Sequence, residues 1–221
     1  LYHTFPNPDN IYIVSLTLYD NEGKAGTAQR EIMIDQNVPP ETTIRHGFES
    51  KASTWYDETQ RISFAATDWT KVINTYYRID GGDWERYIAT EHQYIPVSSE
   101  GEHTIEVYSI DYWNNQETPV TETFSIDKTD PSVDMSLSGP QEDGWYLNKV
   151  TVTLSGEDAL SGIYKLFYKY KTSDWVEYNS PFTIDDVTGT VNLHFMAVDN
   201  AGNQDVDEAQ IKIKDSSCCR E

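Results

Sequence analysis

Cysteine is almost absent from this chain. The only two cysteines, Cys218 and Cys219, are adjacent and lie close to the end of the 221 residues. Neighbouring cysteines in this position cannot cross-link a core, so each domain has to be stabilised by packing alone. The pair either belongs to an unstructured tail or forms bonds with another chain.

Basic residues are also scarce. Lys and Arg number 16 against 37 Asp and Glu, which gives a formal net charge of −21. Phosphate contacts need Lys and Arg, so we expect no nucleic-acid partner. The acidic surface favours solubility and divalent cations instead. No apolar stretch approaches the roughly 20 residues that a membrane-spanning helix requires, so we expect no membrane span in this segment.

The sequence lacks the local signatures of common enzymes. There is no H-E-x-x-H pair to hold zinc and no G-x-S-x-G turn to present a serine. The five histidines are scattered, at His3, His46, His92, His103 and His194. Acidic pairs such as Asp185 and Asp186 are typical of a solvated acidic surface. We therefore predict that this segment is not an enzyme.

What the chain does contain is alternating hydrophobic runs. The run "YIVSLTLY" places Tyr12, Val14, Leu16 and Leu18 on one face, which is the period-2 pattern of a half-buried strand. "HTIEVYSI" and "VNLHFMAV" alternate in the same way. No helical pattern of useful length appears. Many short strands with frequent turn signals predict an all-β chain of antiparallel β-sandwiches.

Each of these three runs ends in an aspartate followed by a polar turn. Asp20, Asp111 and Asp199 are separated by steps of 91 and 88 residues. The third residue after each aspartate is glycine or asparagine, at Gly23, Asn114 and Gly202. Gly and Asn tolerate positive φ, so we expect one turn geometry at all three places.

The repeat predicts the domain organisation. Two complete units of about 90 residues are expected, at residues 38–127 and 128–215, with a tail at 216–221. Prolines near the start of each unit suit a strand start or a stiff linker. Residues 1–37 hold only the end of a third copy. Either this copy is cut from a longer protein, or another chain supplies its missing strands, which would make the protein a subunit of a self-assembling fibre.

Several stretches resemble known families. "YHTFPNPDNIYIVSLTLYDNEGKAGTA" resembles the C-terminal third of a polycystic kidney disease (PKD) domain. "YRIDGGDW", "GEHTIEVYSID" and "AVDNAGN" resemble bacterial and archaeal Ig-like surface repeats of the type first described in leptospiral outer-membrane proteins. The second unit departs from that pattern, with "YKTSDW" where a double glycine is usual. The resemblances imply Ig-like sandwiches, an extracellular or cell-surface location in a prokaryote, and a spacer, adhesion or accessory role without catalysis.

Repeated aspartates are the candidate metal ligands. In an Ig-like sandwich, the point where the chain enters, the B–C loop and the F–G loop share one end, so three carboxylates per unit should converge there. The predicted calcium ligands are Asp35, Asp68 and Asp111 in the first unit, and Asp127, Asp158 and Asp199 in the second. Calcium takes six to eight oxygen ligands. The alternative is that each aspartate only caps its own turn.

Aromatic residues divide into repeated and unrepeated ones. Those with a counterpart in both units are expected in the core or on a sheet face: Trp55, Trp84 and Tyr87, and Trp145, Trp175 and Tyr178. Trp69, Tyr112 and Trp113 occur only in the first unit, in its B–C and F–G loops. These three either bind a ligand, such as a glycan or another surface protein, or pack against a preceding domain.

Together these observations predict a non-catalytic extracellular segment that acts as a spacer between neighbouring domains of a longer chain, or in adhesion. The first alternative is a carbohydrate-binding accessory module of a secreted hydrolase. The second is a fibre subunit assembled by strand complementation.

Overall fold

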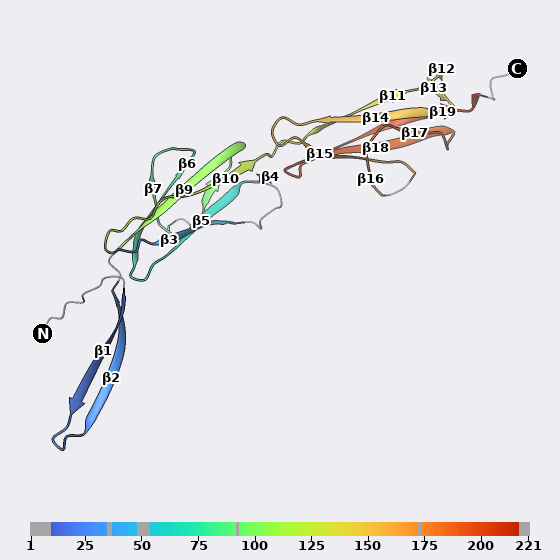
Figure 1. Ribbon diagram of the computed structural model, residues 1–221. Helices are drawn as coiled ribbons and strands as arrows, with labels where there is room; N and C mark the ends of the chain where they lie inside the picture. Colours follow the sequence, from blue (N-terminus) through green and yellow to red (C-terminus); the bar gives the residue numbers. More distant parts are fainter. Residues whose placement is uncertain (1–9, 35–36, 48–53, 92, 172–173, 217–221) are drawn as a thin grey trace. The chain divides into compact units, whose positions relative to one another are not determined.

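The structure is a computed structural model that describes residues 10–34, 37–47, 54–91, 93–171 and 174–216 (Figure 1). Every named element in these ranges is a β-strand, so the predicted all-β class is confirmed. None of the described residues belongs to a helix long and apolar enough to cross a membrane.

The folded chain divides into two compact bodies, which are not the same as the two repeat units expected from the sequence. Among the described residues, one comprises 10–34, 37–47, 60–91, 93–97 and 103–123, and the other comprises 54–59, 98–102, 124–171 and 174–216. This division does not follow the expected domain limits at residues 37, 127 and 215, which stay predictions.

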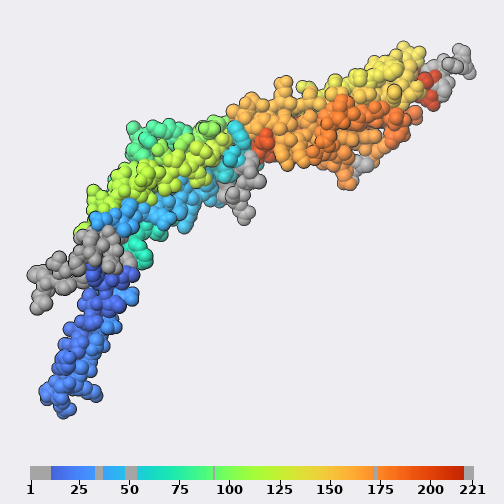
Figure 2. Space-filling view, viewed as in Figure 1, coloured from blue at the N-terminus to red at the C-terminus, as the bar shows by residue number. Residues whose placement is uncertain are grey.

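The first two strands form a separate antiparallel hairpin. Strand β1 (Asn10–Tyr19) pairs with β2 (Ala25–Ile34), and neither strand has another partner among the described strands. Figure 2 shows this hairpin in blue, and no second sheet is paired with it among the described strands. Its apolar face is therefore open: Val14 is 40% exposed, Leu16 59% and Leu18 65%.

Two sheets between residues 41 and 126 form the first sandwich. Their strand orders are β3-β5-β8 and β4-β10-β9-β6-β7. The bounds are β3 Glu41–His46, β4 Trp55–Tyr56, β5 Gln60–Thr67, β6 Val72–Ile79, β7 Glu85–Tyr87, β8 Ile95–Val97, β9 Gly101–Asp111 and β10 Val120–Ile126. Burial alternates along β9, with Ile105 and Val107 fully buried. Alternation of this kind turns one face of each strand toward a shared core.

The second sandwich repeats this order. Its sheets are β11-β14-β17 and β12-β13-β19-β18-β15-β16. The bounds are β11 Ser132–Ser138, β12 Gln141–Glu142, β13 Trp145–Leu147, β14 Val150–Glu157, β15 Ile163–Lys169, β16 Val176–Glu177, β17 Phe182–Ile184, β18 Gly189–Asp199 and β19 Gln204–Lys214. Fully buried aliphatic side chains from both sheets, including Val152 and Leu193, form its core.

In both sandwiches the first strand is divided between the two sheets. β3 pairs with β5 in one sheet, while the short β4 that follows it runs parallel to the last strand, β10, in the other. In the second sandwich β11 pairs with β14, and β13 runs parallel to β19. This shared arrangement supports the predicted Ig-like sandwich.

The three aspartate turns share one geometry, as predicted. Gly23, Asn114 and Gly202 have φ of 83°, 67° and 107°. The backbone N–H of each aspartate donates to the carbonyl four residues later, at 3.0 Å for Asp20 and at 3.1 Å for both Asp111 and Asp199. Positive φ at the fourth residue of the turn explains why only Gly and Asn occur there.

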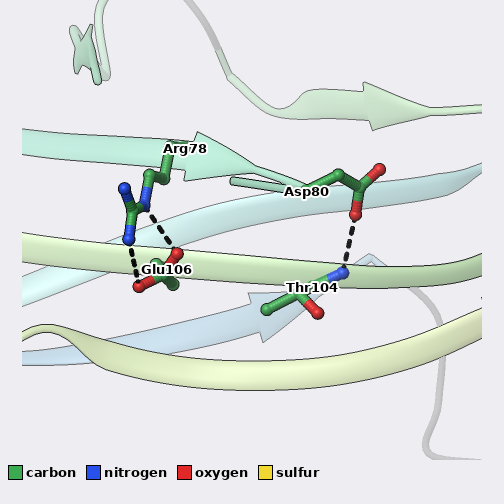
Figure 3. A network of polar contacts seen from close by, with 4 residues as sticks. All are labelled: Arg78, Asp80, Thr104 and Glu106. Carbon is green, nitrogen blue, oxygen red and sulfur yellow. Dashed lines mark hydrogen bonds and ion pairs between the residues drawn. The ribbon is translucent and has the colours of Figure 1, made fainter. Parts of the chain in front are cut away.

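Two of the repeated tryptophans, Trp84 and Trp175, lie on the outer face of a sheet rather than in a core. Trp84 is half-buried, and the guanidinium of Arg78 lies 4.6 Å from the centre of its ring. Arg78 also donates two hydrogen bonds to Glu106, at 2.6 and 2.8 Å (Figure 3). In the second unit, the ammonium of Lys169 lies 4.4 Å from the ring of Trp175. The repeat thus preserves a cation above an aromatic ring.

Candidate functional site

The structure brings together the three repeated aspartates of the second unit. Asp127 follows β10, Asp158 lies in the loop between β14 and β15, and Asp199 ends β18. One carboxylate oxygen from each lies within 4.8 Å of those of the other two. Asp127 and Asp199 are buried and Asp158 is half-buried. The convergence expected from the repeat is thus present.

These carboxylates also cap turns. The carboxylate of Asp127 accepts the N–H of Thr129 and the N–H of Ser161, both at 3.0 Å. The Asp199 carboxylate accepts the N–H of Gly202 at 2.6 Å, and both the N–H and the side-chain amide of Asn203, at 2.8 and 2.7 Å. Turn capping and clustering are therefore compatible.

Asp158 uses a single oxygen for its own loop. Oδ1 accepts the N–H groups of Leu160 and Gly162, at 3.1 and 2.6 Å. In the described part of the chain, no basic side chain forms an ion pair with Asp158, Asp127 or Asp199. Close carboxylates repel one another unless a proton or a cation relieves the repulsion. A hard cation such as Ca²⁺ suits this all-oxygen set.

A fourth carboxylate reaches the same turn. Asp57 Oδ2 lies 3.7 Å from the position that a side-chain carbon at Gly202 would occupy. Sequence reasoning did not single out Asp57, because the position after the corresponding Tyr146 holds Leu147 and the repeat carries no signal there.

The described residues of the first unit do not show an equivalent group. Asp35 lies outside the described residues. Asp68 caps its loop by accepting the N–H and the hydroxyl of Thr70, at 2.8 and 2.6 Å. Asp111 is buried and accepts the N–H and side-chain amide of Asn115, at 2.7 and 2.8 Å. No group of three metal-ligating side chains involves Asp68 or Asp111 within the described ranges.

The unrepeated aromatics are exposed loop residues. Trp69 is 73% exposed, Tyr112 65% and Trp113 48%, and the last two rings meet edge to face at 5.5 Å. Trp69 also lines an open hollow of about 410 Å³, whose other walls are Val38, Pro39, Glu41, Thr67 and Asp68. An indole beside two carboxylates offers a stacking surface and hydrogen-bond acceptors to a hydroxyl-rich ligand.

Comparisons with known proteins leave the family open. No protein-family model and no curated protein matches this chain. Among solved structures, the fibronectin(III)-like modules of Clostridium thermocellum CbhA are 12% identical with a TM-score of 0.42, over 81% of this chain and 98% of theirs. A structure of a 1.5-MDa bacterial ice-binding adhesin is 15% identical with a TM-score of 0.39, over 94% of this chain and 76% of the adhesin chain. Likenesses this weak do not establish a family or a function.

Proposed function

We propose that this chain is a non-catalytic spacer or adhesion segment of a prokaryotic surface or secreted protein, with tandem sandwiches that hold neighbouring domains apart. One observation carries the proposal: the segment that follows β10 is hydrogen-bonded residue by residue. The N–H of Asp127 donates to the Tyr56 carbonyl at 2.9 Å, and the N–H of Lys128 donates to Glu100 at 2.7 Å. The Thr129 hydroxyl donates to the same carboxylate at 2.9 Å. A hydrogen-bonded segment at this point suits a spacer better than a flexible linker would.

Domain exchange tests the spacer role. Residues 38–215 would be replaced, in the protein that carries them, by two unrelated Ig-like domains or by a Gly/Ser linker of equal residue count. The spacer role predicts that the folded replacement keeps surface attachment or adhesion, while the linker loses it, since flexible chains do not maintain a distance. Loss of function with both replacements would refute the spacer role and favour direct adhesion, because it would mean that specific residues of this segment bind a partner.

A calcium ion held by Asp127, Asp158 and Asp199 is a second proposal, supported by their mutual approach within 4.8 Å. Such an ion would cross-link the segment after β10 to two loops of the second sandwich. Ligands that bind only the folded state stabilise it by about 2.7 kcal/mol at a hundredfold excess over the dissociation constant. Thermal unfolding would be measured in millimolar calcium and in chelator.

The calcium proposal predicts a higher melting temperature in calcium for the natural chain and no shift for Asp158→Asn. Asp174→Asn is the matched control, because this aspartate lies outside the group and should leave the calcium shift intact. If the melting temperature of the natural chain is the same in calcium and in chelator, the calcium proposal is refuted.

Glycan binding is the alternative that the exposed aromatics favour. Trp69, at 73% exposure, borders the hollow that also contains Asp68 and Glu41. Retardation in polysaccharide gels would be measured for the natural chain and for Trp69→Ala and Trp113→Ala. Binding that both variants retain would exclude this role for both loops.

Fibre assembly is favoured by the open face of the β1–β2 hairpin. Strands from another chain could cover the exposed apolar side chains of this face, as in strand complementation. Sedimentation across a range of concentrations would detect polymer, and a monomer at every concentration would rule assembly out.

A further inference from the structure

Each sandwich contains a carboxylate that bonds the backbone of its first strand. In the first unit, the N–H of Thr42, the second residue of β3, donates to Glu117 Oε2 at 3.0 Å. In the second unit, the N–H of Val133, the second residue of β11, donates to Asp205 Oδ2 at 3.0 Å. Glu117 and Asp205 each lie six residues after the aspartate that opens the preceding turn. The two bonds are therefore equivalent, and we call each one a carboxylate clip.

The clip supplies a hydrogen-bond acceptor to an edge of the first strand that no neighbouring described strand covers. β3 is an edge strand with β5 as its described partner, and its continuation, β4, pairs with β10 in the opposite sheet. Before that crossing, the edge of β3 away from β5 has no ladder partner among the described strands. A side-chain carboxylate supplies the acceptor; it comes from the segment before β10 in the first unit and from the second residue of β19 in the second. It thereby ties the first strand to the last one at their common end.

The clip of the first unit is a buried network. Glu117 is 8% exposed and Thr42 4%. Besides the N–H of Thr42, Glu117 accepts the Thr42 hydroxyl and, at 2.7 Å, the N–H of Ser109. The Ser109 hydroxyl contacts the hydroxyls of Thr42 and Thr75, at 2.7 and 2.8 Å. Both oxygens of the Glu117 carboxylate accept hydrogen bonds. A glutamine amide could not replace them, because its NH₂ group donates and does not accept.

We propose that Glu117 and Asp205 are mechanical clips that keep the first strand of each sandwich in place when the chain is pulled from its ends. The inference rests on the proposed spacer role, in which tension passes along the chain. Tension enters each sandwich at its first strand and leaves at its last. The two strands run in the same direction where they pair, at β4–β10 and β13–β19. Pulling therefore shears them along their length and loads the clip directly.

Single-molecule pulling of the whole chain by its two ends tests the clip. Glu117→Gln should rupture one sandwich about tenfold faster at fixed force, as expected for the loss of one charge-assisted hydrogen bond. Either orientation of the new amide sets a donor against the N–H of Thr42 or Ser109. Glu106→Gln is the matched control, because it breaks the bonds from Arg78 on the outer sheet face, away from the first strand.

The second unit supplies an independent pair of variants. Asp205→Asn keeps a carbonyl that can accept the Val133 N–H and should leave the rupture rate within twofold, whereas Asp205→Ala should raise it about tenfold. Urea unfolding of each variant would report equilibrium stability. The proposal is overturned if Glu117→Gln, or Asp205→Ala where the former does not fold, ruptures no faster than a control of equal equilibrium stability. Failure of the domain exchange would refute the spacer role and leave this result unaffected.

Discussion

Asn203 binds the backbone of Asp127 across 76 residues of sequence: its side-chain amide donates to the Asp127 carbonyl at 2.9 Å. The same amide lies 3.2 Å from the Thr129 carbonyl and 2.7 Å from Asp199 Oδ2. One turn residue thus orients both the aspartate that opens its turn and the segment that follows β10.

Replacing this amide should destabilise the second unit. Asn203→Ala leaves the Asp127 carbonyl without this donor in a part-buried position, at an expected cost of about 1–3 kcal/mol. Urea unfolding would give the free-energy change. Asn192→Ala, at an exposed position of β18, is the control and should change stability by less than about 0.5 kcal/mol. Equal losses for the two variants would contradict the role assigned to Asn203.

The turn glycine should resist substitution for a conformational reason. Gly202 has φ of 107°, and a side-chain carbon there would meet Asp57 only at the ordinary contact distance of 3.7 Å. Gly202→Ala should therefore lower the free energy of unfolding by about 1–2 kcal/mol, the cost of positive φ for a residue with a side chain. Asn114→Gly, at the equivalent position, should be nearly neutral. A neutral Gly202→Ala in urea unfolding would show that the turn can relax.

The raised pKa of Tyr77 predicts that the free energy of unfolding falls at alkaline pH. Burial, together with the hydrogen bond to Glu85, raises the pKa of Tyr77 from 10.0 to about 12. The unfolded chain releases this proton near its ordinary pKa of about 10, before the folded chain does. The Tyr77 contribution is therefore fully present below pH 10 and is lost as the pH rises through about 12.

Urea midpoints measured between pH 8 and 12.5 would check this dependence. Tyr77→Phe should flatten the alkaline slope, whereas Tyr164→Phe, at a tyrosine that is 60% exposed, should retain it. Identical slopes for the natural chain and Tyr77→Phe would refute the assignment.

The loop tryptophans should contribute little to stability. Trp69→Ala and Trp113→Ala remove rings that are 73% and 48% exposed, so each should change the free energy of unfolding by less than about 0.5 kcal/mol. Trp84→Ala should cost more, because its ring contacts Tyr108 at 4.6 Å and lies 4.6 Å from the Arg78 guanidinium. A large loss at Trp69 would indicate that the ring is packed in solution, as expected if a preceding domain covers it.

Local pattern was sufficient for the strands and turns. Alternation in "HTIEVYSI" and "VNLHFMAV" places the buried side chains of β9 and β18, because side chains of a strand point alternately to its two faces. Positive φ was predicted at Gly23, Asn114 and Gly202, since that conformation is strained for most other residues. The approach of Asp158 to Asp127 also followed from the sequence, once the order of strands in an Ig-like sandwich was assumed.

The clips and the position of Asp57 depended on tertiary structure. Glu117 belongs to an acidic sequence in which most carboxylates are solvated. It is buried because β3 meets the segment before β10, which brings Glu117 to Thr42, 75 residues away in sequence. The outward position of Trp84 was likewise decided by packing against Tyr108 and Arg78. Sequence by itself determined what each strand and turn does locally, because backbone preferences act over a few residues. Which polar groups lie against one another was decided only when the two sheets packed, since that choice depends on contacts between distant parts of the chain.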